Sequence, residues 1–136
     1  MPSAVLDASA VLAWTNKERG WETIDKLLAV AVIPAPNLTE VFYRPLERGF
    51  TAAAATLHAL LRGTGLTVEP ATEVDSIRAA ELIATSRAAR TAPNSPCLSL
   101  GDGLCIAVAE RLALPVVGGD EHWETLDLWT RYMPFR

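Results

Sequence analysis

The feature that most constrains this fold is the order in which short strand-like runs and helix-like segments alternate along the chain. Strand-like runs rich in Val, Ile and Leu occur at residues 4–6, 30–33, 66–69 and 115–118. The segments between them place apolar residues three and four positions apart, which is typical of amphipathic helices. Strands joined through helices pair in parallel, with helices on both faces of the sheet. We therefore predict an α/β protein, a three-layer α/β/α sandwich with a mainly parallel central sheet.

Helices are predicted at residues 21–31, 37–49, 51–63, 72–90 and 101–112. Asn37 is expected to cap the second of these helices, and Pro45 predicts a kink or an interruption within it. In the fourth helix, the apolar stripe is expected to consist of Val74, Ile77, Ala80 and Ala84. A loop rich in Pro, Ser and Asn follows at residues 91–96, and the tail at 129–135 is expected to add a last strand.

The composition predicts one globular domain spanning residues 1–136, because half of the residues are hydrophobic and 21% are charged. No run approaches the roughly 18 apolar residues of a membrane-spanning helix. The first residues lack the basic start and apolar core of a secretory signal, so a cytoplasmic location is expected. Cys97 and Cys105 have no partner at zinc spacing, and Cys105 is expected to be a buried thiol.

The net charge of −4 disfavours a protein that holds a phosphate backbone by charge alone. Acids gathered at one metal site would nevertheless leave arginines elsewhere free to meet a nucleic acid. The arginines in question, interpreted mainly as solvated helix faces with phosphate contact as the alternative, are Arg44, Arg48, Arg87 and Arg90. Net charge therefore weakens a nucleic-acid function without excluding it.

Four acidic residues stand where predicted elements begin or end, and they are Asp7, Glu40, Asp102 and Asp120. Asp7 and Asp120 follow strands, and the other two lie in the first turns of helices. In an open α/β sheet, ligands gather at the carboxyl ends of the strands, so all four side chains can converge on one edge. The remaining acids mostly lie on predicted helix faces among polar neighbours.

Each of these acids alone has a simpler interpretation, because an acidic residue at a helix start commonly caps or complements the helix. As a set they repel one another, and a divalent cation with oxygen ligands removes that repulsion. Mg²⁺ or Mn²⁺ held in this way can position and activate a water and stabilise charge on a phosphate. The set therefore predicts a metal site for phosphodiester hydrolysis.

At these residues the sequence resembles the PIN domain family. The similarity lies in an apolar strand ending in Asp with Ser two positions later, a helical Glu, a third acid at a helix start, and a fourth acid after a late strand. These motifs occupy residues 5–10, 37–41, 98–109 and 114–123. They occur in the family's order over essentially the whole chain.

The resemblance implies a PIN fold and Mg²⁺- or Mn²⁺-dependent cleavage of RNA. Asp7, Glu40, Asp102 and Asp120 would then be the catalytic metal ligands, with Ser9 as a supporting hydroxyl. The chain length is similar to that of VapC toxins, which form homodimers and are held inactive by a VapB antitoxin. One departure is Gly118, where many relatives carry Thr or Ser two positions before the fourth acid. Gly118 and Gly119 are expected to let the backbone approach the site closely.

Two alternatives remain open at this stage. A housekeeping RNA-processing nuclease of the same family would share the site but would not arrest growth. A receiver-type signalling module also groups acids around Mg²⁺ at strand ends, but it needs paired acids near the first strand and a late Lys. This sequence has one Asp after its first strand and no Lys beyond Lys26, so the nuclease is favoured.

Overall fold

The computed structural model describes residues 1–51 and 53–136, and a five-stranded sheet forms its centre. The strands are β1 (Ala4–Leu6), β2 (Ala31–Pro34), β3 (Thr67–Glu69), β4 (Val116–Gly118) and β5 (Tyr132–Pro134). They lie in the order β3-β2-β1-β4-β5, and every neighbouring pair is parallel. The predicted parallel sheet is confirmed, including the last strand in the tail.

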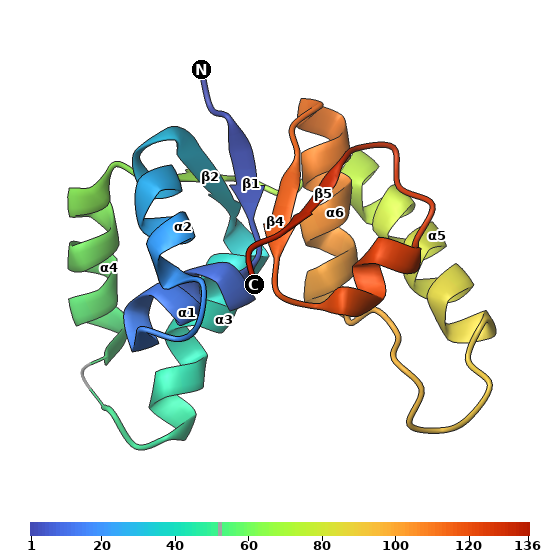
Figure 1. Cartoon of the computed structure of the whole chain (residues 1–136), viewed down its shortest axis with the longest axis horizontal. Coiled ribbons are helices and arrows are strands. Elements are labelled where there is room, and N and C mark those ends of the chain that lie inside the picture. The colour runs from blue at the N-terminus through green and yellow to red at the C-terminus, as the bar shows by residue number, and fades with distance from the viewer. Residues whose placement is uncertain (52) are drawn as a thin grey trace.

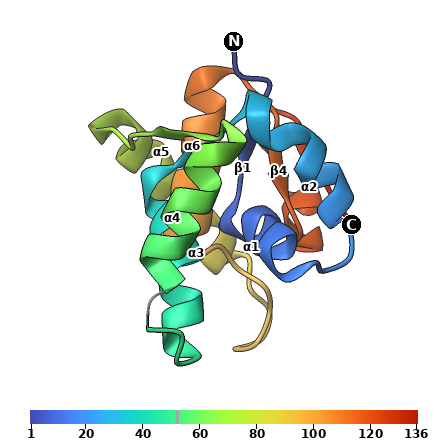
Figure 2. The same cartoon turned by 90° about the vertical axis from the view of Figure 1, so that its left-hand side faces the viewer.

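The helices of the described residues cover both faces of this sheet. They are α1 (Ala8–Asn16), α2 (Trp21–Leu27), α3 (Ala35–Glu47), α4 (Ala53–Thr64), α5 (Glu73–Ala88) and α6 (Leu100–Leu112), with short 3₁₀ helices η1 (Leu28–Val30) and η2 (Glu121–Thr125). Helices α2 and α4 lie to one side of the strands, and α5 and α6 lie to the other (Figure 1). Figure 2 shows α2 and α4 in front of the sheet when that side faces the viewer.

Alternation along the strands divides the core into two clusters. Leu6, Ile33 and Val117 pack with α1 to α4, whereas their neighbours Val5, Val32 and Val116 pack with α5, α6 and η2. Successive side chains of a strand point to opposite faces, so each buried strand serves both clusters. The three-layer α/β/α sandwich is therefore confirmed, and Cys105 is buried in the second cluster as expected.

Helix α3 begins earlier than the sequence suggested. Pro34 is its N-cap residue, and Pro36 lies in the first turn, where the missing amide hydrogen is not needed. Asn37 is therefore inside the helix, and the prediction that it caps the helix is wrong. The predicted interruption at Pro45 is also wrong, because α3 continues to Glu47 and packs against α1, α4 and α6.

Helix α5 is rotated from the predicted orientation. Val74 and Ile77 are 67% and 63% exposed, so the predicted stripe is wrong. The buried residues are Asp75, Ala79, Leu82 and Ser86. Asp75 forms a capping box with Thr72 and accepts hydrogen bonds from Arg111 of α6, which turns this polar edge inward. Asp75 is therefore an exception to the expectation that the remaining acids mostly lie on helix faces among polar neighbours.

Smaller differences concern the ends of elements. The helix predicted at residues 21–31 ends at Leu27, and a 3₁₀ turn leads into β2. The helix predicted at 51–63 corresponds to α4, although Ala52 lies outside the described residues. Within the described residues, no helix has the length and hydropathy needed to cross a membrane.

Candidate active site

All four acids selected from the sequence line one pocket of about 920 Å³, which we call the acid pocket. Asp7 directly follows β1, and Asp120 follows β4, which is paired with β1 in the middle of the sheet. Asp102 comes from the first turn of α6. Glu40 comes from the second turn of α3, which begins at Ala35, so the prediction that Glu40 lies in a first turn is wrong. The expected convergence on one sheet edge is therefore observed, and it lies at the carboxyl ends of adjacent strands.

Asp7 is the most buried of the four, with 6% of its surface exposed. It is the N-cap residue of α1 and accepts hydrogen bonds from the Ser9 amide at 3.2 Å and the Ser9 hydroxyl at 2.7 Å. Burial and the nearby charge of Asp102 raise the pKa of Asp7 to about 7, although the bonds from Ser9 oppose the rise. None of the ion pairs of the described residues includes Asp7, so no cationic side chain there compensates the charge of this buried carboxyl group.

Ser9 joins the ends of the two central strands. Its hydroxyl donates to Asp7 Oδ2 and accepts from the Gly119 amide at 3.1 Å. A hydroxyl can do both at once, so one side chain fixes the Asp7 carboxylate and the backbone that leads to Asp120. The geometry agrees with the supporting position expected for Ser9.

Asn37 holds the same carboxylate from the other side. Its Nδ2 donates to Asp7 Oδ1 at 3.4 Å and to the Gly101 carbonyl at 3.1 Å, and the residue is fully buried. Its Oδ1 has no hydrogen-bond partner in the described residues. Asn37 thus connects the end of β1 with the start of α6. The sequence reasoning had assigned this Asn to a helix cap and missed that position.

Asp102 both caps a helix and faces the pocket. Its carboxylate accepts from the Ser99 amide at 2.9 Å, and the Ser99 hydroxyl accepts from the Asp102 amide, so the pair forms a capping box at the start of α6. Burial, together with the charges of Asp120 and Glu40, raises the pKa of Asp102 against the opposing bonds from Ser99. Asp102 therefore both caps α6 and lines the pocket.

The other two carboxylates also have partners. Glu40 forms an ion pair with Arg44 at 3.2 Å, and Asp120 accepts from the His122 amide at 2.9 Å. Among the described residues, no group of three or more His, Cys, Asp or Glu side chains has an arrangement that holds a metal ion as it stands. Binding one would require at least some of these carboxylates to turn from their present partners into the pocket.

The chemistry of the donor set fits a hard divalent cation. The acids supply oxygen ligands only, and Cys105, the nearby thiol, is buried beneath them with its pKa raised by burial and by Asp7. Oxygen ligands select Mg²⁺ or Mn²⁺ over softer metals. Burial and, after it, repulsion from neighbouring acids raise the pKa values of Asp7 and Asp102, and such a cation would relieve the repulsion.

Steric overlap does not exclude a larger residue than glycine at position 118. A Cβ there would meet Asp7, Trp123 and Tyr132 at 3.5 Å, which is ordinary contact. The expected close approach of backbone is therefore not required at Gly118. At Gly101 a Cβ would lie 3.5 Å from Glu40 Oε1 and 3.7 Å from Asn37 Nδ2, which is also ordinary contact. At Gly119, by contrast, a Cβ would lie 2.8 Å from Nε and Nη2 of Arg136. The close approach expected at this pair of glycines is therefore present at Gly119, against the Arg136 guanidinium.

Two residues of the tail also reach the site, and the sequence carried no signal for them. Arg136 lines the pocket, and the Tyr132 hydroxyl donates to the Asp120 carbonyl at 2.8 Å. Both positions follow from the pairing of β5 with β4, which places Gly118 opposite Pro134. Strand neighbours of this kind are decided by sheet order and cannot be read from local sequence.

Comparison with known proteins gives one family and several similar folds. The PIN domain family model matches residues 4–127. No protein of curated function matches the sequence. A structure of DNA-bound VapBC from Salmonella typhimurium is similar with a TM-score of 0.69 and 17% identity, with 100% of both chains covered.

Two structures from Mycobacterium tuberculosis are also similar. VapC20, described as a toxin that cleaves the sarcin–ricin loop, has a TM-score of 0.68 and 18% identity, covering 95% of this chain and 99% of its own. VapBC-5 has a TM-score of 0.61 and 22% identity, with 99% of both chains covered. At these identities the likeness establishes the fold.

Proposed function

The chain belongs to the PIN domain family, and on that basis we propose that it is a metal-dependent endoribonuclease of the VapC toxin type. The observation that carries the proposal is one pocket lined by Asp7, Glu40, Asp102 and Asp120. In a VapBC-type pair, the nuclease would act on RNA when released from its antitoxin. The solved VapBC and VapC structures of similar fold support this assignment.

In this proposal the four acids hold Mg²⁺ or Mn²⁺ and are the catalytic residues. The bound metal would supply an activated water and stabilise charge on the attacked phosphate. Ser9 and Asn37 hold the Asp7 carboxylate from two sides, so they orient it toward the pocket. Outer partners of this kind commonly contribute tenfold to a hundredfold to metal affinity or activity.

Arg44 has a further role in this scheme. Its guanidinium pairs with Glu40, and its side chain is 51% exposed. If Glu40 turned toward a bound cation, the Arg44 guanidinium would lose this partner and could meet a phosphate oxygen in the adjoining cavity that Arg44 lines. In the present arrangement the ion pair compensates the charge of Glu40.

Partners are proposed from the same likeness. We expect a VapB-type antitoxin to hold the nuclease inactive and the nuclease to form a homodimer. Growth arrest on expression of the chain alone, relieved by the antitoxin, would distinguish a toxin from a housekeeping RNA-processing nuclease of the same family. Unchanged growth together with RNA cleavage in vitro would favour the housekeeping function.

The central test is cleavage of single-stranded RNA by the purified protein in Mn²⁺ or Mg²⁺. Asp7→Asn should lower the cleavage rate by more than about 100-fold, because it removes a metal ligand, and Ser9→Ala should lower it by about tenfold. Asp127→Asn is a matched control, since Asp127 is exposed and does not line the pocket. Cleavage by Asp7→Asn at the parent rate, or full activity in EDTA, would refute the proposal.

A further inference from the structure

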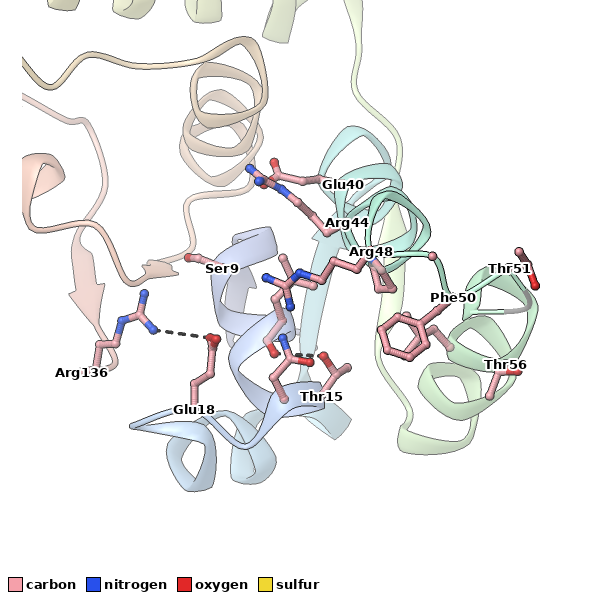
Figure 3. Close-up of a pocket in the computed structure, with 15 residues that line it drawn as sticks. Ser9, Thr15, Glu18, Glu40, Arg44, Arg48, Phe50, Thr51, Thr56 and Arg136 are labelled. Carbon is pink, nitrogen blue, oxygen red and sulfur yellow. Dashed lines mark hydrogen bonds and ion pairs between the residues drawn. The ribbon is translucent and has the colours of Figure 1, made fainter. Parts of the chain in front are cut away.

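A second cavity of about 770 Å³ lies beside the acid pocket, between α1, the C-terminal part of α3 and α4. We call it the α1–α3–α4 groove. Its walls include Leu12 and Thr15, Arg44 and Arg48, and Phe50 and Leu57 (Figure 3). Ser9, Glu40 and Arg136 line both the groove and the acid pocket. The two cavities are therefore contiguous, and a polymer bound in the pocket can continue into the groove.

Charge distinguishes the groove from the pocket. The pocket is lined by six acidic side chains, and Arg136 is the one arginine or lysine among the described residues that line it. The groove is lined by Arg44, Arg48 and Arg136, and its two acids are each paired with an arginine: Glu40 with Arg44, and Glu18 with Arg136 at 3.7 Å. In a chain of net charge −4, this is a local cationic path that starts at the acids.

Arg48 differs from the other two arginines of the groove in its charge pairing. None of the ion pairs of the described residues includes it. Figure 3 shows Arg48 extending from α3 across the groove, with its guanidinium between α3 and α1. A guanidinium in this position presents several N–H donors to a phosphate.

An exposed aromatic ring lies in the same groove. Phe50 is 63% exposed, and its ring lies in the groove at the end of α3, beyond Arg48 (Figure 3). An unpaired base can stack on such a ring, whereas a base within a duplex has no free face. Cationic side chains that can contact phosphates, followed by an exposed ring on which a base can stack, are therefore a combination that recognises single-stranded nucleic acid.

We propose that the α1–α3–α4 groove binds the unpaired RNA segment adjacent to the phosphate held at the acids. Arg48 and Arg136 contact flanking phosphates, and a base stacks on Phe50. The inference rests on the proposed nuclease function and adds the substrate path to it.

The test measures binding of a fluorescein-labelled, mixed-sequence single-stranded RNA of about 12 nucleotides to the full chain carrying Asp7→Asn, which prevents cutting, in MgCl₂. Arg48→Gln and Arg136→Gln should each weaken binding about five- to tenfold and lower the salt dependence by about one phosphate contact. Arg131→Gln is the matched control. Arg131 is exposed and precedes β5, at the sheet edge opposite the pocket, so binding should change less than about twofold.

Phe50→Ala tests the stacking part separately. It should weaken binding about fivefold or more without changing the salt dependence, because no phosphate contact is lost. Trp129→Ala is its control, since Trp129 is 71% exposed and also precedes β5. A blunt RNA duplex should compete poorly with the single strand for binding to the Asp7→Asn chain. Thermal melting of each variant shows whether the fold is retained.

The substrate path would be overturned if Arg48→Gln, Arg136→Gln and Phe50→Ala, each added to the Asp7→Asn chain, bound RNA as tightly as the Asp7→Asn chain itself. It would also be overturned if the duplex competed as well as the single strand, or if the Asp7→Asn chain did not bind RNA. If the variants keep their RNA affinity but no longer bind a co-expressed antitoxin, the groove is a protein-binding site, and the proposed substrate path is overturned as well. Failure of the nuclease proposal looks different. In that case the wild-type chain does not cleave RNA, although the groove variants still weaken binding.

Discussion

Two buried aspartates in this protein have opposite surroundings. Asp75, at the contact between α5 and α6, is 1% exposed and accepts two hydrogen bonds from Arg111 Nε, at 2.9 and 3.1 Å. Burial alone would raise its pKa, but the bonds from Arg111 and Thr72 lower it below the usual value. Asp7, in the acid pocket, is 6% exposed, and its pKa is raised to about 7.

The other acidic side chains near these two aspartates show the same difference in charge pairing. Near Asp75, Glu110 is also buried and receives a two-point contact from Arg78 at 2.7 and 3.1 Å. At Asp7, the charges that act on the carboxyl group are the carboxylates of Asp102 and Glu40, and both raise its pKa. A buried acid that has an arginine contributes to the fold, whereas a buried acid surrounded by acids is held ready for a ligand. The comparison teaches that burial of an acid becomes informative about function only once its partners are known.

The largest expected effect on stability is the pH dependence of Asp7 in the metal-free protein. The folded-state pKa of about 7 lies above the ordinary value of 3.8, so the folded state binds this proton more tightly. Stability should therefore fall as pH rises from about 4 to about 7, by up to about 4 kcal/mol from Asp7 alone. Urea denaturation in EDTA across this range should show a smaller fall for Asp7→Asn than for the parent, and equal slopes would contradict the comparison.

At Asp75 the same chemical change should have the opposite sign. Asp75→Asn should lower the free energy of unfolding by about 3 kcal/mol at pH 7, because it leaves the Arg111 guanidinium without its buried carboxylate. RNA cleavage per folded molecule should be retained, since Asp75 lies outside the acid pocket. Chemical denaturation and cleavage at a temperature where the variant is folded check both parts. A stable but inactive Asp75→Asn would show that the division between the two regions is wrong.

Asn37→Leu, which keeps a side chain of similar size, tests how the pocket is held. It should cost about 1–2 kcal/mol of stability, because the buried Gly101 carbonyl loses its donor. It should also weaken Mn²⁺ binding measured by electron paramagnetic resonance, since Asp7 loses the donor that orients it. Reduced stability with unchanged Mn²⁺ affinity would restrict Asn37 to a structural role.

The smallest effect is expected at Asp102. Asp102→Asn relieves repulsion in the metal-free pocket but weakens the bond to the Ser99 amide, so the two effects oppose each other. We expect a stability change below about 1 kcal/mol at pH 7, compared with a gain for Asp7→Asn under the same conditions. Melting of both variants in EDTA provides the measurement. A gain at Asp102 as large as that at Asp7 would mean that its helix cap contributes little.

Much of the fold was predictable from the sequence because strand and helix periodicities are local properties. The runs at β1, β2, β3 and β4 were each located to within about a residue. The exposed stripe of α5 shows where this reasoning fails. Val74 and Ile77 are apolar and suitably spaced, yet the pairing of Asp75 with Arg111 on α6 turns the other face inward. A contact between residues 36 positions apart leaves no trace in local periodicity.

The candidate site divides in the same way. Asp7, Asp102 and Asp120 could be found because each stands beside a strand end or a helix start, and the topology of a parallel sheet brings such positions together. Glu40 was selected as a residue of a first helical turn, but α3 begins at Ala35 and places it in the second turn. Asn37 was misassigned, because the same residue type commonly caps a helix, and its actual position depended on two prolines being accepted within the helix start. The site positions of Arg136 and Tyr132 had no local signal.

What the sequence determined by itself is therefore the set of elements, their parallel order and the acids at their ends, since all of these follow from spacing along one chain. The tertiary structure alone decided which acids are neutralised, which remain close to other acids, and that a cationic groove adjoins them. The physical reason is that burial and charge pairing depend on distances between side chains that are remote in sequence, and only the packed chain sets those distances.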